Sequence, residues 1–256
     1  MTKTQKSLMR VVGLLMGMVV LLSGLLTYLV LDTFAMHKTG GGKAVIYPFP
    51  EGLQSSIDCL VKVNGVYTFV YDVLVNFRRD SPNGNAQDVL QREPTPVTSF
   101  DMEGEVEVEI TLPGQTIETA KVTPEARGIT PKVKGDTVTF TVDKPGQLTV
   151  EFNDDVHGAL HLFANEIETD IPDENDPNVI YFGPGVHEAG QINVASGQSV
   201  YLAGGAVVRG WVYGSGVDNV RVYGRGVFDG STFERYREDG TTGNQKVPIN
   251  FENCTN

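Results

Sequence analysis

The chain has 256 residues and 29 glycines, and its 20 basic and 32 acidic side chains give a formal net charge of −12. This length allows about two modest domains. An acidic body repels phosphate backbones, so nucleic acid is excluded as an expected partner. The two cysteines, Cys59 and Cys254, lie far apart in the sequence, so neither a disulfide-stapled scaffold nor a thiolate zinc site is expected.

The N-terminal residues 1–36 predict a membrane anchor or a signal segment. Residues 11–31 carry no charge and, as a helix, would reach about 31 Å, which is enough to cross a bilayer. Basic residues precede this stretch and Asp32 follows it, so the positive-inside bias places the body outside the cytoplasm. The alternative is a cleaved signal peptide, although its apolar core usually spans about 7–15 residues. Either way the body is extracytoplasmic, membrane-anchored or secreted.

Residues 37–43 are glycine-rich and predict a flexible tether. The next segment, 44–165, alternates apolar and polar residues over short stretches, which predicts an antiparallel, Ig-like β-sandwich. In Glu105–Leu112 the apolar residues alternate with glutamates, so one face of that strand is expected in the core and the other in solvent. Hairpins are predicted at Asn64-Gly65, at Lys134–Asp136 and at Lys144–Gln147. An acidic, proline-bounded linker is predicted at 166–178.

From residue 179 to residue 256 short strand-like fragments alternate with glycine-rich turns. The apolar sets Val200–Leu202 and Val220–Val222 recur about 20 residues apart, and Ile249–Phe251 repeats the pattern after an insertion. A period of this kind, built only of strands and turns, is typical of a β-solenoid, in which each coil covers the next. The overall expectation is an all-β chain.

Three stretches of this region resemble a known family. Val179–Val186 (VIYFGPGV), Ser199–Arg209 (SVYLAGGAVVR) and Asn219–Ser231 (NVRVYGRGVFDGS) resemble the opening coils of the polygalacturonase-like glycoside hydrolases. Asp101–Gly104 and Leu160–Asn165 resemble the N-terminal sandwich of bacterial members and of the related dextranase-like family. The resemblance implies a right-handed parallel β-helix of the pectin lyase-like kind and a pectic polysaccharide as substrate. It also implies inverting hydrolysis by two carboxylates, without metal or cofactor.

The family's catalytic motifs lie on later coils, and none of them occurs in the coils of this sequence. A parallel coil ending at Asn256 would also present unpaired backbone groups, which natural solenoids cover with a cap. We therefore expect these residues to be the N-terminal portion of a longer enzyme, with its catalytic residues unknown. We expect a monomer.

Four residues are candidates for a role at a site. Asp229 is expected to be structural and to bond the amides of a turn. Trp211, the only tryptophan, either offers a platform for a sugar ring or packs at the edge of a coil. Arg235 and Arg237 either contact the carboxylate of a uronate or pair with the acidic residues of their own loop. His157 and His161 lie in strand and turn context, so a zinc site is not expected.

Two rival functions remain open at this stage. The first is a dextranase-like hydrolase of a neutral glucan, which the acidic charge favours because pectate is itself a polyanion. The second is a non-catalytic module at the cell surface that binds carbohydrate or has a structural role. Hydrolysis of polygalacturonate or of dextran would discriminate among the three.

Overall fold

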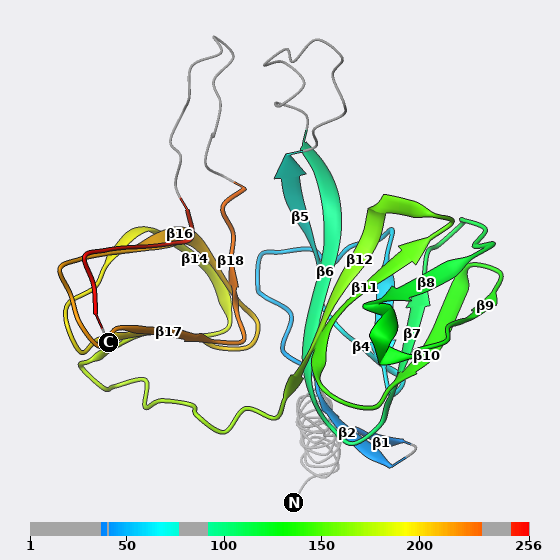
Figure 1. Cartoon of the computed structure of the whole chain (residues 1–256), viewed down its shortest axis with the longest axis horizontal. Helices are drawn as coiled ribbons and strands as arrows, with labels where there is room; N and C mark the ends of the chain where they lie inside the picture. The colour runs from blue at the N-terminus through cyan, green and yellow to red at the C-terminus, as the bar shows by residue number, and fades with distance from the viewer. Residues whose placement is uncertain (1–36, 40, 77–91, 232–246, 256) are drawn as a thin grey trace, which may run out of the picture. The chain divides into compact units, whose positions relative to one another are not determined.

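The computed structural model describes residues 37–39, 41–76, 92–231 and 247–255 (Figure 1). These residues belong to one compact unit, His37–Asn256. The predicted membrane segment, residues 11–31, lies outside the described residues. Within the described ranges no helix is long and apolar enough to span a bilayer. The described structure is built of strands, apart from one short 3-10 helix, η2 (Glu125–Arg127).

The first part of the unit is a sandwich of two sheets, which we call sheet A and sheet B. In the described residues sheet A has the strand order β1-β2-β6-β12-β11-β8. β5 pairs with residues 92–98 of β6, along the edge of β6 that faces away from β12. Its strands are β1 (His37–Thr39), β2 (Gly42–Val45), β5 (Val70–Asn76), β6 (Arg92–Glu103), β8 (Ala120–Thr123), β11 (Gly146–Phe152) and β12 (Asp155–Glu166). Sheet B has the order β4-β3-β7-β10-β9. Its strands are β3 (Leu60–Val63), β4 (Val66–Tyr67), β7 (Val106–Thr111), β9 (Lys132–Lys134) and β10 (Thr137–Val142).

The core of the sandwich lies between the two sheets, and the alternation of side chains along each strand explains how it forms. In β7, Val106, Val108 and Ile110 are buried, whereas Glu107 between them is exposed, as the sequence pattern predicts. Sheet A contributes Phe100, Leu160 and Leu162 among other fully buried side chains. The predicted hairpin at Asn64-Gly65 joins β3 to β4, with positive φ angles of 48° and 81° at its two turn residues.

The predicted tether at 37–43 is wrong, because β1 and β2 pair with each other and β2 pairs with β6. A glycine is needed there for close packing rather than for flexibility. A Cβ atom on Gly42 would lie 2.0 Å from the carbonyl oxygen of Glu105.

Two further expectations about the sandwich are corrected. β6 and β12 are parallel neighbours, with His161 opposite Val97, so the sandwich is not wholly antiparallel. These strands are distant in sequence, and no tight turn fixes their relative direction. The segment Lys144–Gln147 is not a hairpin, because it carries the chain from β10 in sheet B to β11 in sheet A. There Arg127 donates a hydrogen bond of 3.2 Å to the carbonyl oxygen of Pro145.

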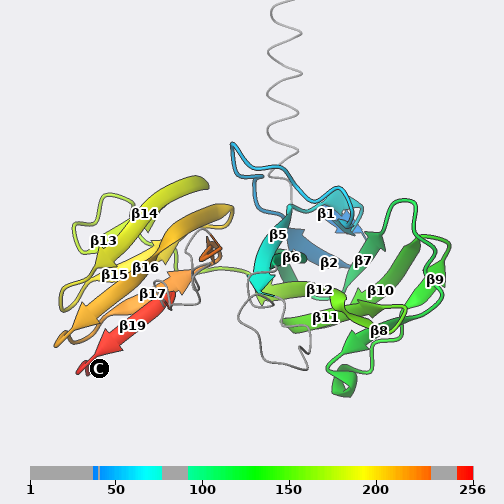
Figure 2. The same cartoon turned by 90° about the horizontal axis from the view of Figure 1, so that it is seen from above.

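The second part of the unit consists of parallel coils (Figure 2). Sheet C contains β13 (Val179–Phe182), β15 (Ser199–Leu202) and β17 (Arg221–Gly224), and all of its pairings are parallel. Sheet D contains β14 (Gly185–Asn193), β16 (Ala206–Ser215), β18 (Val227–Phe228) and β19 (Ile249–Glu252), again all parallel. Valine, leucine and isoleucine side chains from both sheets fill the space inside the coils. The predicted solenoid of parallel strands is therefore present.

The register of the coils differs in detail from the recurrence in the sequence. Val200 pairs with Ile180 on one side and with Val222, not Val220, on the other, so successive coils differ in length by two residues. Ile249–Phe251 does not extend sheet C, because β19 pairs with β16 in sheet D. The repeat of apolar residues therefore predicts the approximate length of a coil, but the unequal lengths of the turns determine which residues pair in neighbouring strands.

The predicted linker, 166–178, contacts the outer face of sheet C. Three tyrosines, Tyr181, Tyr201 and Tyr223, form a ladder on that face, with neighbouring ring centroids 5.1 Å apart. The hydroxyl of Tyr201 donates a 3.0 Å hydrogen bond to Glu168 of the linker. Tyr201 is only 1% exposed, although its side chain points away from the interior of the coils.

Candidate functional site: the outer face of sheet D

The outer face of sheet D gathers aromatic, amide and carboxylate side chains. In β16, Val208 and Val212 point into the coils, so by alternation Arg209, Trp211 and Tyr213 point outward. The parallel register places further polar residues beside them. Gln191 lies opposite Trp211, Asn193 and Asn250 flank Tyr213, Glu188 lies opposite Arg209, and Glu252 lies opposite Ser215. We call these side chains the sheet D face.

Hydrogen bonds along the strands hold the polar side chains of this face in place. Gln191 Nε2 donates to Asn193 Oδ1 at 2.7 Å, and Asn250 Nδ2 donates to Glu252 Oε1 at 3.3 Å. The hydroxyl of Tyr213 donates to Glu252 Oε2 at 3.4 Å. Exposed amides and a carboxylate beside aromatic rings match the chemistry of a pyranose, which has hydroxyl groups at its rim and apolar C–H faces.

The charge of the face is balanced among its described residues. Arg209 Nη1 lies 2.6 Å from Glu188 Oε1, and Arg209 Nε lies 3.4 Å from Asp229 Oδ2. The hydrogen bond to Glu188 is the main reason that the pKa of Arg209 is raised. The described part of the face thus presents no uncompensated cation to a ligand.

Asp229 follows β18 and is fully buried, with no exposed surface. It accepts a 2.8 Å hydrogen bond from the amide of Ser231 and a 2.6 Å hydrogen bond from the hydroxyl of Tyr71 in sheet A. Burial favours a higher pKa, but the hydrogen bonds from Ser231 and Tyr71 outweigh it, so the pKa of Asp229 lies below its usual value. A buried, ionised carboxylate held in this way is suited to fixing a corner of the coil and unsuited to donating a proton.

Sequence reasoning missed a second buried carboxylate, Asp101 at the end of β6, which is 2% exposed. Arg225 Nε lies 2.8 Å from Asp101 Oδ1, and the amide of Glu168 donates to Asp101 Oδ2 at 2.8 Å. The hydroxyl of Tyr47 also donates to Asp101, and burial followed by this bond raises the pKa of Tyr47 above its usual value. Asp101 and Asp229 therefore join the sandwich to the coils at two separate points.

The feature of the sequence that could have indicated the contact between Asp101 and the coils is the Gly-Arg-Gly turn at 224–226. A Cβ atom on Gly224 would lie 2.0 Å from the carbonyl oxygen of Leu202, and one on Gly226 would lie 2.8 Å from that of Ala206. The two glycines let the turn lie close against the preceding coil, and Arg225 between them reaches Asp101.

The structure separates the residues that the sequence singled out. Trp211 lies on the sheet D face with intermediate exposure, whereas Asp229 is buried against the sandwich. Arg235 and Arg237 lie outside the described residues. The described ranges contain no cluster of three or more histidine, cysteine or acidic side chains able to hold a metal.

Comparisons with known proteins identify a similar fold but do not show an activity. No protein-family model matches the chain, and no curated protein matches it. Among solved structures it is similar to Dex49A from Penicillium minioluteum, with a TM-score of 0.59 and 17% sequence identity. The match covers 82% of this chain and 53% of that one, so the chain spans about half the length of Dex49A. The shared architecture extends over more of the chain than either the sandwich or the coils alone.

Proposed function

We propose that the protein is a glycoside hydrolase of the β-helix type that acts on a neutral glucan, and that the sheet D face binds the polysaccharide. The observation that carries this proposal is the charge balance of the face. Its arginine, Arg209, is paired with Glu188 and Asp229, whereas Trp211, Tyr213 and the neighbouring amides present uncharged groups of the kind that suit a neutral sugar.

The structural comparison supports the choice of a glucan. Dex49A is a dextranase, and dextran is a neutral polymer of glucose. The net charge of −12 is in keeping with this choice, because an acidic protein repels a polyanion such as pectate.

A galacturonan remains the second candidate, because the three stretches in the coils resemble polygalacturonases. Recognition of a uronate carboxylate needs a cation, preferably the two-pronged guanidinium of arginine. In this candidate function Arg235 and Arg237 would supply that contact. The neutral glucan and the anionic galacturonan therefore differ in whether the site must supply a cation.

The proposed reaction is inverting hydrolysis. One carboxylic acid protonates the glycosidic oxygen, and a carboxylate about 6.5–9.5 Å away activates water on the opposite side of the sugar ring. On the described sheet D face Glu188 forms an ion pair with Arg209. Glu252 has hydrogen bonds to Tyr213 and Asn250 but no ion pair among the described residues. We assign this face to substrate binding and leave the catalytic pair unassigned.

The test uses the 256-residue chain with dextran and with polygalacturonate. We expect dextran in a native gel to retard the protein, and Trp211→Ala to weaken that binding about tenfold, the loss expected for one stacked aromatic ring. Tyr67→Ala is the matched control, because Tyr67 is an aromatic residue of sheet B that is 53% exposed. We expect it to bind dextran as the unmodified protein does.

Release of reducing ends measures hydrolysis in the same samples. Reducing ends from dextran would support the proposal. Binding and cleavage of polygalacturonate alone would replace the glucan with the galacturonan. Binding of dextran without any reducing ends would favour a non-catalytic carbohydrate-binding module.

A further inference from the structure

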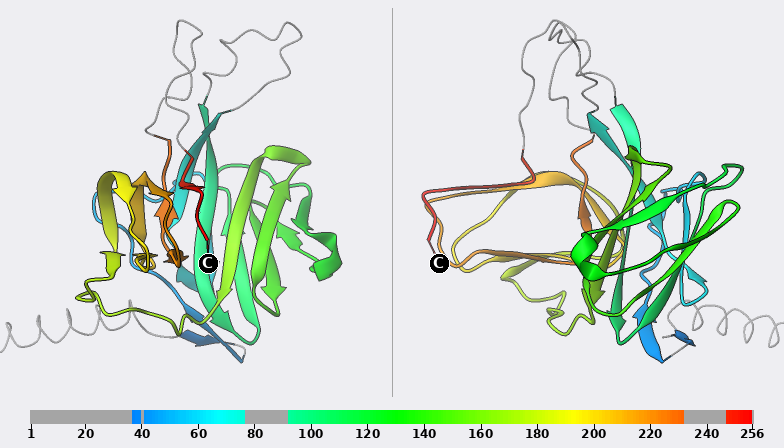
Figure 3. Two further views of the ribbon diagram at one scale, coloured as in Figure 1. Left: turned by 60° about the vertical axis from the view of Figure 1, so that its left-hand side comes forward. Right: turned by 45° about the vertical axis from the view of Figure 1, so that its right-hand side comes forward.

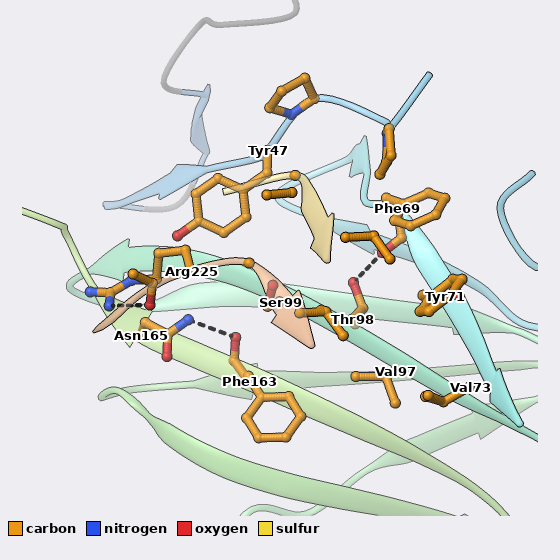
Figure 4. Close-up of a pocket in the computed structure, with 18 of the residues that line it drawn as sticks. Tyr47, Phe69, Tyr71, Val73, Val97, Thr98, Ser99, Phe163, Asn165 and Arg225 are labelled. Atoms are coloured by element: carbon orange, nitrogen blue, oxygen red, sulfur yellow. Dashed lines mark hydrogen bonds between the residues drawn. The ribbon is translucent and has the colours of Figure 1, made fainter. Parts of the chain in front are cut away.

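A cavity of about 470 Å³ lies between the sandwich and the coils (Figure 4). Its size falls within the range of about 300–1,000 Å³ that is typical of sites for small molecules. Protein interiors are packed as densely as organic crystals and contain few voids larger than a water molecule. A cleft of this size, open to solvent on one side and walled by two parts of the same compact unit, is accessible to a small ligand.

One wall of the cavity is the outer face of sheet A, the face turned away from the sandwich core. Alternation puts every second residue of three neighbouring strands on this face. Tyr71 of β5 lies opposite Val97 of β6, which in turn lies opposite His161 of β12. Phe163 lies opposite Ser99 in the next rung. The side chains of this wall that bear on its ligand are those of Phe69, Tyr71, Ser99, His161, Phe163 and Asn165.

The opposite wall comes from the corners of the coils and from the segment after β2. Gly205–Val207 and Gly224–Val227 supply the corners, and Tyr47, Pro48 and Pro50 close a further side. A Cβ atom on Gly204 would lie 2.1 Å from the ring of Tyr47, so this segment is seated directly on the coil. Prolines and tightly packed turns give the cavity a preformed shape, which lowers the entropic cost of binding.

Aromatic rings provide a broad apolar surface inside the cavity. The rings of Phe69 and Tyr71 are nearly parallel, with an interplanar angle of 21° and centroids 5.9 Å apart (Figure 4). Phe69 immediately precedes β5, and its ring and that of Tyr71 together form a continuous wall. Such a wall suits the C–H face of a sugar ring.

The polar groups of the lining decide the charge of the ligand. Arg225 is the one side chain of the described lining that carries a permanent charge, and Asp101 neutralises it. The hydroxyl of Tyr71 is committed to Asp229. An anionic ligand would therefore meet no uncompensated cation in this lining.

Three polar side chains of the lining keep hydrogen-bonding capacity. Asn165 uses its Nδ2 atom for the carbonyl oxygens of Phe100 and Phe163, which leaves its Oδ1 atom as an acceptor. His161 uses Nδ1 towards Thr149, which leaves Nε2. The hydroxyl of Ser99 has no hydrogen bond within the described ranges. A wholly apolar ligand would leave such groups unpaired in a desolvated site, which is unfavourable.

We propose that this cavity binds one unit of a neutral saccharide, as a second carbohydrate site separate from the sheet D face. The choice of saccharide rests on the proposed function, whereas the existence of the site rests on the cavity itself. Its ligand would stack on Phe69 and Tyr71 and form hydrogen bonds with Ser99 and Asn165.

The experiment measures binding of isomaltose by titration calorimetry to the 256-residue chain and to the same chain carrying Trp211→Ala, in which binding by the sheet D face is weakened, and each serine variant is compared in both. Ser99→Ala removes one hydroxyl group from the wall, and we expect about tenfold weaker binding, the effect of one lost hydrogen bond to a desolvated site. Ser99→Leu projects a larger side chain into the cavity, and we expect binding there to be abolished. Thr141→Ala, on an exposed position of sheet B, is the matched control and should bind isomaltose unchanged.

Thermal unfolding of each variant shows whether it is folded, and Ser99→Ala decides the outcome should Ser99→Leu fail to fold. With the sheet D face weakened by Trp211→Ala, the binding that remains should be the binding that Ser99→Ala weakens and Ser99→Leu abolishes. It would be overturned by folded serine variants that bind isomaltose as the unmodified chain does, or by no binding of isomaltose to that chain. Failure of the proposed function would look different, with isomaltose bound in the cavity while dextran is neither bound nor cleaved through the sheet D face.

Discussion

The outer faces of the two sandwich sheets have opposite character. Sheet B presents Glu107, Glu109 and Lys62, whereas the outer face of sheet A presents Phe69, Tyr71 and Phe163. In both views of Figure 3 the teal strands β5 and β6 of sheet A lie next to the coils. An antiparallel sheet with one solvated face normally alternates apolar and polar residues, as β7 does. The apolar outer face of sheet A is therefore what the coils require for docking.

The same contrast holds for charged groups. Lys62 and Glu109 on sheet B lie 2.7 Å apart, and their side chains are 30% and 35% exposed. Asp101 and Arg225 lie 2.8 Å apart, and the Asp101 side chain is 3% exposed. Water screens the first pair but is excluded from one partner of the second. Similar geometry should therefore have very different energetic consequences, and substitutions on the two faces measure the difference.

The largest effect is expected for Arg225→Met, which leaves the buried carboxyl group of Asp101 without its cation. Removing one partner of a buried pair costs about 3–5 kcal/mol. The free energy of unfolding, from urea titration at neutral pH, measures this loss. Lys62→Met removes the cation of the exposed pair on sheet B and should cost at most about 1 kcal/mol. Equal losses for the two variants would mean that coil docking does not bury Asp101.

Tyr71→Phe should have the next largest effect, because it removes the hydrogen bond to Asp229. A hydrogen bond to a charged group contributes about 1.5–3 kcal/mol. The pKa of Asp229 is lowered by its hydrogen bonds, so its stabilising contribution is present above about pH 4, its usual pKa, and is lost as the pH falls through the lower folded value. The difference in unfolding free energy between the two proteins should therefore shrink in acid.

The stability of the protein at alkaline pH provides a second test of the hydrogen bond between Tyr71 and Asp229. Burial and the bond to Asp229 raise the pKa of Tyr71 to about 12, above its usual value of about 10. The unmodified protein should thus lose stability as the pH rises from about 10 to 12, and this loss should be smaller in Tyr71→Phe. Melting temperatures of both proteins across the acidic and the alkaline range test these two expectations. A difference in melting temperature between the two proteins that stays constant at every pH would contradict the hydrogen bond.

Much of the sandwich and the coils was predictable, because local patterns determine them. The glutamate stripe of β7 and the turn at Asn64-Gly65 identify strand faces and a hairpin from neighbouring residues alone. The parallel pairing of β6 with β12 was not predictable, because it joins segments about 60 residues apart. The hairpin expected at Lys144–Gln147 failed for a related reason, since a proline-glycine turn can also carry a chain between sheets.

The candidate site was predictable only in part. Trp211 was singled out by its rarity, and its outward direction follows from alternation with Val208 and Val212. Asp101 was missed because a single acidic residue in a strand gives no local sign of its partner 124 positions away. A signal for the docked face did exist in Ala159–Ala164 (ALHLFA), an almost continuous apolar run that indicates burial on both sides of a strand.

Gly204→Ala tests the seating of the segment after β2 on the coil, with a cost of about 1–3 kcal/mol for overpacking. Its Cβ atom would overlap the ring of Tyr47, which would have to move away from Asp101. Gly230→Ala is the control, since a Cβ atom there meets no atom within 4 Å. Thermal unfolding of both variants measures the difference, and an equally small shift for each would show that Tyr47 has room to move.

The smallest effect is expected on the solvated side of the sandwich, where Glu107→Gln removes one charge from the stripe of β7. Glu107 is exposed and has no ion pair within the described ranges, so the free energy of unfolding should change by less than about 0.5 kcal/mol. Urea titration measures it beside Arg225→Met. A loss as large as that of the buried pair would show that something covers sheet B as well, and the contrast between the two faces would then disappear.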